Sequence, residues 1–449
     1  MIEAGILVHW RRGTLSAALR CVGLILLSAP VAAAQTFIDF DDFSRRLEAS
    51  TPESRQELSD SFVRWQQGHG GFPIVEHDSS VVFFFRGSGN EQDVRVTGDF
   101  RPSSFFSVYW DSIGSPMTRI GQIFYGRMKF QPDARFDYKL VVDGHSTVDA
   151  LNPRRVISGP GGGEVSELVM ARHRLPTEIL VRPGTPRGIL SVVQEPWATP
   201  KVSIYLPPGY SPSSRYPTLY TADGSAWIGL VQLPTILDNL ISSGEIEPII
   251  AVMIDATSDR RGWYYYNPEY LTYLRRVLAY VDSHYPTRRN ADQRAHVGTS
   301  AGGRASLYVG LELPQVFGKI GMLSPSLDGP AYYYEPYFSD SRRPNHNLRI
   351  WLSAGTYEGV IYRDAQTMEA YFKKVGVKTR AVYVHQGHSF GAWRELTPDM
   401  LKYLFPPNPD NRHPIGSYKS RLTNVAADKH FRIRLRRNGD NVLAAELRR

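Results

Sequence analysis

The stretch AHVGTSAGGRA, residues 295–305, decides the fold. It places Ser300 in the pattern Gly-x-Ser-x-Gly, after an apolar approach that ends at Val297. Residues 305–313 then have the apolar spacing of a helix. Glycines on both sides permit a turn between strand and helix that is tight enough to hold a serine with its hydroxyl exposed. We therefore predict a nucleophile elbow, and the alternative is an ordinary strand-to-helix turn in which Ser300 caps the helix.

Strand and helix patterns alternate on both sides of this turn, from Gly188 onward. Short apolar runs typical of buried strands occur at residues 202–206, 217–221, 249–254, 320–324, 349–353 and 380–384. Helices are expected at about residues 230–241 and 268–283. This order predicts an α/β fold with a mostly parallel sheet flanked by helices. A central elbow makes it an α/β hydrolase.

The partners of Ser300 in this fold follow it in the order acid, then histidine, each after the end of a strand. Glu358 comes just past the strand at 349–353, and His388 comes past the last strand. We predict that His388 takes the proton of Ser300 as general base, while Glu358 orients its imidazole. His385 is the rival histidine, but it lies within the strand pattern. Asp364 and Asp399 are the rival acids: the first falls in a helix pattern and the second follows His388.

Backbone N–H groups are expected to complete the site. The N–H of Ala301, directly after the nucleophile, is predicted to face a developing oxyanion. A second donor should come from the loop after an earlier strand, where residues 223–227 read DGSAW. The N–H of Ser225 is the candidate, and the alternative is a plain Asp-Gly turn.

The N-terminal part of the chain has a different period. A helix is predicted over residues 43–67, and strands alternating at period two follow at residues 81–85, 93–96, 124–130 and 136–142. Turn signals separate these strands, which favours a β-sandwich. The predicted organisation is a signal peptide (1–34), a helical segment (35–72), an all-β sandwich (73–180), the hydrolase domain (188–405) and a basic tail (406–449) that is disordered or forms a short strand pair.

Two resemblances follow from these residues. The stretches 96–100, 136–144 and 149–153 resemble the immunoglobulin-like module that precedes the catalytic domains of glycogen-branching enzymes and of enterochelin esterases. The hydrolase part resembles the esterase family of enterochelin esterases, feruloyl and acetyl-xylan esterases and mycolyltransferases. Its matching stretches are residues 223–227, 254–256, 298–303, 324–326, 354–358 and 387–388.

The resemblance implies an ester hydrolase that forms an acyl-enzyme on Ser300, acting on a catecholate siderophore ester. A feruloyl or acetyl esterase, an acyltransferase and a non-catalytic binding protein stay open as alternatives. The chain departs from the family at residues 260–267, RRGWYYYN, where the expected glutamate is absent. The aromatic residues of this run and of residues 332–334 either line an aryl-accepting cleft or are ordinary loop residues. Aromatic residues 105–110 are expected to be core or interface residues rather than sugar platforms.

Composition limits the remaining classes. The 449 residues carry a formal net charge of +8, much of it near the two ends, so no nucleic-acid partner is predicted. Basic residues, a short apolar run and Ala32-Ala33-Ala34 predict a cleaved signal peptide and a periplasmic or secreted protein without a stable membrane span. Cleavage would remove Cys21, the only cysteine. We therefore expect neither disulfide, metal nor cofactor, and a small-molecule ester as the binding partner.

Overall fold

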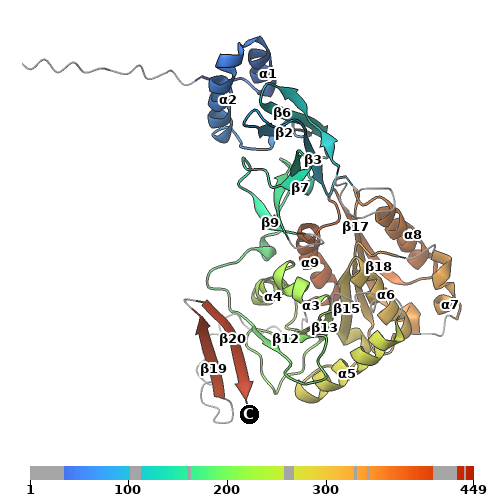
Figure 1. Cartoon of the computed structure of the whole chain (residues 1–449). Helices are drawn as coiled ribbons and strands as arrows, with labels where there is room; N and C mark the ends of the chain where they lie inside the picture. Colours follow the sequence, from blue (N-terminus) through green and yellow to red (C-terminus); the bar gives the residue numbers. More distant parts are fainter. Residues whose placement is uncertain are drawn as a thin grey trace, which may run out of the picture.

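A computed structural model describes residues 35–101, 113–158, 163–256, 267–327, 331–340, 344–407, 432–438 and 441–448. Two layered parts follow one another along the chain, a smaller β part with two N-terminal helices and a larger part built on one central sheet (Figure 1). The predicted signal peptide and the aromatic residues at 105–110 and 263–266 lie outside the described residues.

The larger part is built on an eight-stranded sheet with the order β11-β12-β14-β13-β15-β16-β17-β18. The strands from β14 to β18 pair in parallel, while β11 and β12 add antiparallel pairs at one edge. Their bounds are β11 Ile189–Val192, β12 Val202–Leu206, β13 Thr218–Ala222, β14 Ile250–Ile254, β15 Arg294–Thr299, β16 Lys319–Leu323, β17 Arg349–Gly355 and β18 Lys378–Val384. This is the mostly parallel sheet that the apolar runs predict.

Helices cover both faces of this sheet, which is why its central strands are apolar throughout. One core lies between the sheet and α5, α6 and α8, and a second lies between the opposite face and α3, α4 and α9. The helices are α3 Gly224–Gly229, α4 Leu233–Ser242, α5 Pro268–His284, α6 Ala301–Glu312, α7 Glu335–Phe338, α8 Val360–Lys374 and α9 Phe390–Leu404. The fold is that of an α/β hydrolase, with β15 and α6 on either side of Ser300.

The smaller part contains two facing antiparallel sheets. One has the order β1-β2-β6-β5 and the other the order β4-β3-β7-β10-β9, with β8 paired to β7. Aromatic and aliphatic side chains from β2, β3, β6, β7 and β10 fill the space between them. The strands are β1 Ile74–Glu76, β2 Ser80–Arg86, β3 Val94–Gly98, β4 Ser115–Pro116, β5 Thr118–Ile120, β6 Ile123–Lys129, β7 Arg135–Val142, β8 His145–Thr147, β9 Arg155–Ile157 and β10 Glu164–Val169. The pattern at period two thus produces a β-sandwich.

The strand β2 is apolar at every central position because both of its faces are covered. Val81 and Phe83 point into the sandwich, whereas Val82 and Phe84 pack against the N-terminal helices. The helix predicted over residues 43–67 is wrong as a single element, since α1 spans Phe40–Ala49 and α2 spans Pro52–Gln67. Proline disfavours helical geometry in the residue before it, so α1 ends before Pro52 and α2 begins there.

The described part of the tail forms a hairpin of β19 Arg432–Asn438 and β20 Asn441–Arg448, as the strand-pair alternative for the tail predicts. Within the ranges that the structure describes, no helix is long and apolar enough to cross a membrane.

Candidate active site

Ser300 lies in a strained turn between β15 and α6. Its backbone has φ 53° and ψ −118°, a conformation that costs a non-glycine residue about 1–3 kcal/mol and persists only where neighbours enforce it. The Ser300 N–H donates to the carbonyl of Leu323 on β16, 2.8 Å away. A Cβ at Gly298 would lie 2.2 Å from the carbonyl oxygen of Gly302, so only glycine fits there. The turn therefore has the geometry of the predicted elbow.

The other two predicted side chains converge on Ser300. The Nε2 atom of His388 lies 2.9 Å from the Ser300 hydroxyl, and its Nδ1 atom lies 3.3 Å from Oε1 of Glu358. Glu358 and His388 are both buried, at 2% and 4% exposure, while Ser300 is half-buried. The second oxygen of Glu358 accepts the N–H of Gly355 at 3.1 Å, which fixes the carboxylate at the end of β17. Hydroxyl, imidazole and carboxylate thus form one hydrogen-bonded row.

The rival side chains lie elsewhere. His385 pairs with Asp133 of the sandwich, with 2.6 Å between Nδ1 and Oδ1. Asp399 lies on α9, where it accepts Nε1–H of Trp351 at 2.8 Å and pairs with Arg380 at 2.6 Å. Asp364 lies on α8, as its helix pattern indicates. The structure brings none of the three into hydrogen-bonding contact with His388.

The two predicted oxyanion donors differ in their surroundings. Ala301 is the first residue of α6, and N–H groups in the first turn of a helix have no partner within that helix. The N–H and the hydroxyl of Ser225 both donate to the carboxylate of Asp255, and Lys201 lies 3.2 Å from the same carboxylate. The N–H of Ser225 already donates to Asp255, so it is not free to donate to an oxyanion, and the role predicted for Ser225 does not fit this structure. The alternative, a plain Asp-Gly turn, is not what the structure has either, since α3 begins at Gly224.

Two neighbours of the site were not assigned a role from the sequence. Ser326, in the loop after β16, has its hydroxyl 3.1 Å from that of Ser300. Trp393, in the first turns of α9, packs its ring edge-on against His388 with centroids 4.8 Å apart. The Trp393 Nε1–H donates to the Ser324 hydroxyl at 3.0 Å, which fixes the indole. Ser324 and Ser326 belong to a stretch that carried the family resemblance, and that was the signal available for them.

A buried imidazole lies on β15, the strand that leads into the elbow. His296 on β15 lies 2.7 Å from the Tyr270 hydroxyl of α5 and 2.9 Å from the Ser306 hydroxyl of α6. Ser306 in turn donates to the carbonyl of Gly302 at 2.9 Å. Burial lowers the pKa of His296 to about 3, so the ring is neutral at physiological pH. The neutral ring joins both helices to the strand that leads into Ser300.

This burial predicts a pH dependence of stability. An unfolded chain binds a proton on histidine below about pH 6.5, and the folded chain does not bind it at His296 until about pH 3. The contribution of His296 is therefore present at neutral pH and is lost as the pH falls, by up to about 1.4 kcal/mol per pH unit. We expect the free energy of unfolding in urea to fall more steeply from pH 7 to 4.5 in the wild type than in His296→Gln. Equal pH dependences of the free energy of unfolding in the two proteins would contradict a neutral, buried His296.

The two aromatic runs, for which a cleft lining and ordinary loop positions are the alternatives, are only partly described. Tyr333 is 56% exposed and Tyr334 is buried at 2%, so neighbours in the sequence have opposite environments. A buried Tyr334 is a core residue of the hydrolase part.

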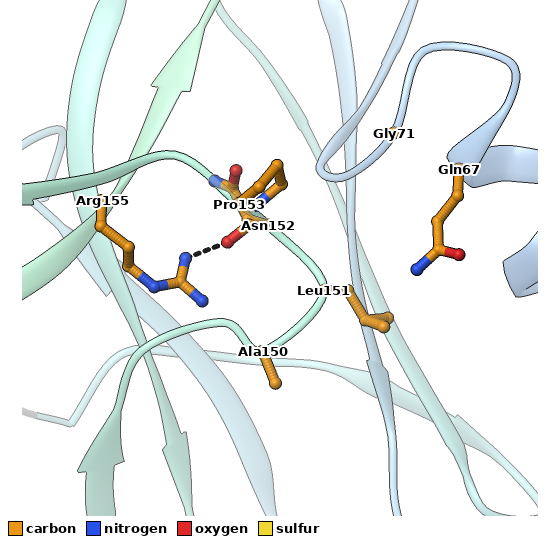
Figure 2. Close-up of a pocket in the computed structure, with 7 residues that line it drawn as sticks. All are labelled: Gln67, Gly71, Ala150, Leu151, Asn152, Pro153 and Arg155. Atoms are coloured by element: carbon orange, nitrogen blue, oxygen red, sulfur yellow. Dashed lines mark hydrogen bonds between the residues drawn. The ribbon is translucent and has the colours of Figure 1, made fainter. Parts of the chain in front are cut away.

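A hollow of about 440 Å³ lies on the sandwich, between the end of α2 and the loop before β9. Figure 2 shows Gln67, Leu151 and Arg155 around it, with Arg155 bonded to the carbonyl of Asn152. The guanidinium also donates to the carbonyl of Asp149 and to the Ser166 hydroxyl. The arginine is thus already bonded within the chain, and none of the residues that line this hollow is aromatic.

The fold brings a serine, an imidazole and a carboxylate within reach of one another, an arrangement typical of the α/β-hydrolase class. Residues 195–404 match the profile of the family described as "Putative esterase". This region, somewhat less than half of the chain, is therefore similar to that esterase family. Within the described residues no group of three or more His, Cys, Asp or Glu side chains is placed to hold a metal ion.

Curated relatives match parts of the chain. The "Uncharacterized protein YjcH" of Bacillus subtilis is 31% identical over 132 residues, which is 28% of this chain and 55% of that protein. The "Endo-1,4-beta-xylanase/feruloyl esterase" of Xylanibacter ruminicola is 27% identical over 221 residues, covering 45% of this chain and 29% of the relative. The chain thus spans about half or less of the length of these two proteins.

Solved structures share the fold over a longer range. The ferric enterobactin esterase of Salmonella typhimurium matches with a TM-score of 0.64 at 18% identity, covering 76% of this chain and 98% of that chain. An enterobactin esterase of Shigella flexneri, determined in the presence of enterobactin, has a TM-score of 0.62 at 20% identity and covers 76% and 97%. A match over 76% of the chain extends beyond residues 195–404, so the shared fold includes more than the esterase region.

Proposed function

We propose that this chain is a serine carboxylester hydrolase with Ser300, His388 and Glu358 as its triad. One observation carries the proposal: Ser300, in strained geometry at the end of a central strand, lies 2.9 Å from an imidazole that itself lies 3.3 Å from a buried carboxylate. A serine hydroxyl is a weak nucleophile until a positioned base removes its proton, and this row supplies that base. An ordinary helix cap would need neither histidine nor glutamate.

The proposed mechanism has two halves. The Ser300 oxygen attacks the ester carbonyl while His388 Nε2 takes its proton, and Glu358 stabilises the imidazolium through Nδ1–H. The N–H of Ala301 stabilises the oxyanion of the tetrahedral intermediate. When this intermediate collapses, His388 protonates the leaving alcohol, and the acyl group stays on Ser300 as an ester. Water then attacks this ester with the same proton transfers, which releases the acid and restores Ser300.

The proposed substrate is a catecholate siderophore ester of the enterobactin type. Support comes from the structural similarity to proteins named enterobactin esterase, which extends over 97–98% of their length. An aryl ester on plant polysaccharide is the second candidate, favoured by the sequence similarity to a protein named in part as a feruloyl esterase. Transfer of the acyl group to another alcohol uses the same acyl-enzyme and is distinguished by product analysis.

The organisation of the chain belongs to the same proposal. Residues 1–34 act as a signal peptide, and the mature chain begins at Gln35 in the periplasm or outside the cell. The sandwich of residues 73–180 is an immunoglobulin-like module after the helical segment 35–72. The esterase domain of residues 188–405 and the basic tail of residues 406–449 follow the sandwich.

One experiment tests both the activity and the export. The full chain is expressed in a Gram-negative host, the periplasmic protein is isolated, and its intact mass gives the first residue. The protein is then assayed on ferric enterobactin, methyl ferulate and p-nitrophenyl acetate. We expect a mass that begins at Gln35 and the highest kcat/KM on ferric enterobactin. A protein inert on all three esters would overturn the hydrolase, and an intact N-terminus in the cytoplasm would overturn the export.

A further inference from the structure

Two charged residues of β7 are buried where the pattern of the strand predicts exposure. Phe136, Tyr138 and Leu140 alternate along β7 and point into the sandwich core. Arg135 and Asp137 therefore lie on the opposite face, which would meet water in an isolated sandwich. Both side chains are nevertheless 0% exposed. The covering groups are α9 and the loop before it, which carries His388.

The guanidinium of Arg135 bonds to the residue that follows His388 in that loop. Its Nη2 lies 2.6 Å from Asp137 Oδ1, and its Nε donates to Glu167 Oε1 at 2.8 Å. Its Nη1 donates to the hydroxyl of Ser389 at 3.3 Å. Ser389 is the residue after His388, and its hydroxyl also caps α9 by accepting the N–H of Ala392. Arg135 thus holds the first cap residue of the helix that follows the proposed base.

The first turn of α9 is shaped to admit this guanidinium. A Cβ at Gly391 would lie 2.2 Å from Arg135 Nη1, so a side chain there would displace the arginine. A cation at a helix N-terminus is unfavourable by itself, because the exposed N–H groups carry partial positive charge. The sandwich carboxylates of Asp137 and Glu167 compensate it, at 2.6 and 2.7 Å from Nη2. The guanidinium is therefore held from the sandwich side.

Further charged groups complete the contact. Glu395 of α9 lies 3.1 Å from His173 Nε2 and accepts the amide of Gln386 at 2.7 Å. Asp99 accepts the N–H of Asp137 at 3.0 Å. Burial, reinforced by the charge of Asp137, raises the pKa of the Asp99 carboxyl well above its ordinary value.

The loop before His388 lies on the sandwich backbone. The N–H of Arg135 donates to the carbonyl of His385 at 3.3 Å, and residues 135 and 386 form a parallel bridge. A Cβ at Gly387 would lie 2.1 Å from the carbonyl oxygen of Asp99, so the two backbones are in direct contact. The sandwich thus touches the residues on both sides of His388.

The sandwich also touches the neighbour of Glu358. The ring of Tyr357 packs edge-on against Phe136 with centroids 4.7 Å apart, and its hydroxyl bonds to Gln131. The N–H of Tyr357 donates to the carbonyl of Gln386 at 3.3 Å, which joins the acid loop to the histidine loop. The Ser300 N–H, by contrast, is bonded to β16 of the central sheet.

We propose that the β-sandwich is a positioning element for the active site, with Arg135 as the positioning residue that sets His388, and through it Glu358, against Ser300. The inference rests on the proposed ester hydrolase. It gives the sandwich a role in catalysis that does not require it to bind a sugar. Buried ion pairs contribute little net stability, so geometry is the more direct reason to bury this one. A displacement of about 1 Å in a catalytic group can cost about 100-fold in rate.

The test replaces Arg135 with methionine in the mature full-length chain and measures ester turnover at a temperature well below unfolding. We expect kcat to fall about 100-fold while KM stays within about threefold, because substrate contacts are unchanged. The rate at which a fluorophosphonate labels Ser300 should fall by the same factor, since labelling needs the base but not the natural substrate. A loss of folded protein alone would change neither constant per folded molecule.

Arg127→Met is the matched control. Arg127 lies on β6, in the other sheet of the sandwich, and pairs with Asp41 at 2.7 Å and Glu76 at 3.3 Å, both outside the contact with α9. This variant should keep the wild-type kcat and labelling rate. Glu167→Gln is the second variant, used if Arg135→Met does not fold. Glutamine has nearly the same shape as glutamate but no charge to pair with Arg135, so kcat should fall about fivefold.

The outcomes separate the two proposals. Wild-type kcat and labelling rate in folded Arg135→Met, or in Glu167→Gln where the first variant is unfolded, overturn the positioning role alone. Slower labelling in these variants but not in Arg127→Met supports it. A wild-type chain that neither turns over esters nor reacts with the fluorophosphonate overturns the hydrolase and, with it, this inference.

Discussion

Ser300→Ala is expected to lower kcat/KM for p-nitrophenyl acetate by at least about 10⁴-fold, because the proposed acyl-enzyme forms on the Ser300 hydroxyl. The change removes one oxygen, whose neighbours are His388 Nε2 at 2.9 Å and Ser326 Oγ at 3.1 Å. Alanine keeps the Cβ, so the backbone strain at φ 53° is unchanged and the fold should be retained. Initial rates on purified protein, with thermal unfolding of both forms, measure the effect.

Ser326→Ala is the control for this prediction, because Ser326 is a second serine of the site and its hydroxyl lies beside that of Ser300. We expect less than about a tenfold change, because Ser326 does not contact His388 within hydrogen-bond distance. Undiminished turnover in Ser300→Ala, or an equal collapse in Ser326→Ala, would mean that the nucleophile is misassigned.

Local sequence rules predicted the elbow and the central sheet well. The strand ends could be placed because buried parallel strands are continuous apolar runs, and the functional residues follow these ends. Short strands such as β4 and β8 lack such a run, because they have only two and three residues, of which Ser115 is half-buried and the others are exposed. Their position is set by pairing with β3 and β7, and no local pattern encodes it.

Charged residues at tertiary contacts could not be predicted in the same way. The alternation of Arg135 and Asp137 with apolar neighbours indicates a solvated face, and the covering helix lies 254 residues away at Ser389. Ser225 is a similar case: its N–H had the right place after a strand, but Asp255 at the end of the next strand accepts it. The single helix predicted over residues 43–67 is wrong for a local reason, because Pro52 begins a second helix, α2, after α1 has ended.

Glu358→Gln is expected to lower kcat by about 10³–10⁴-fold with little change in KM. The amide can donate to Nδ1 of His388 and so favour the wrong tautomer, and it has no charge to stabilise the imidazolium. Steady-state kinetics on p-nitrophenyl acetate measure both constants. Asp364→Asn and Asp399→Asn are the matched controls. Asp399 is committed to Arg380 and Trp351, so its loss should alter stability rather than kcat. A 10³-fold loss in either control, with Glu358→Gln nearly unimpaired, would move the acid of the triad to that aspartate.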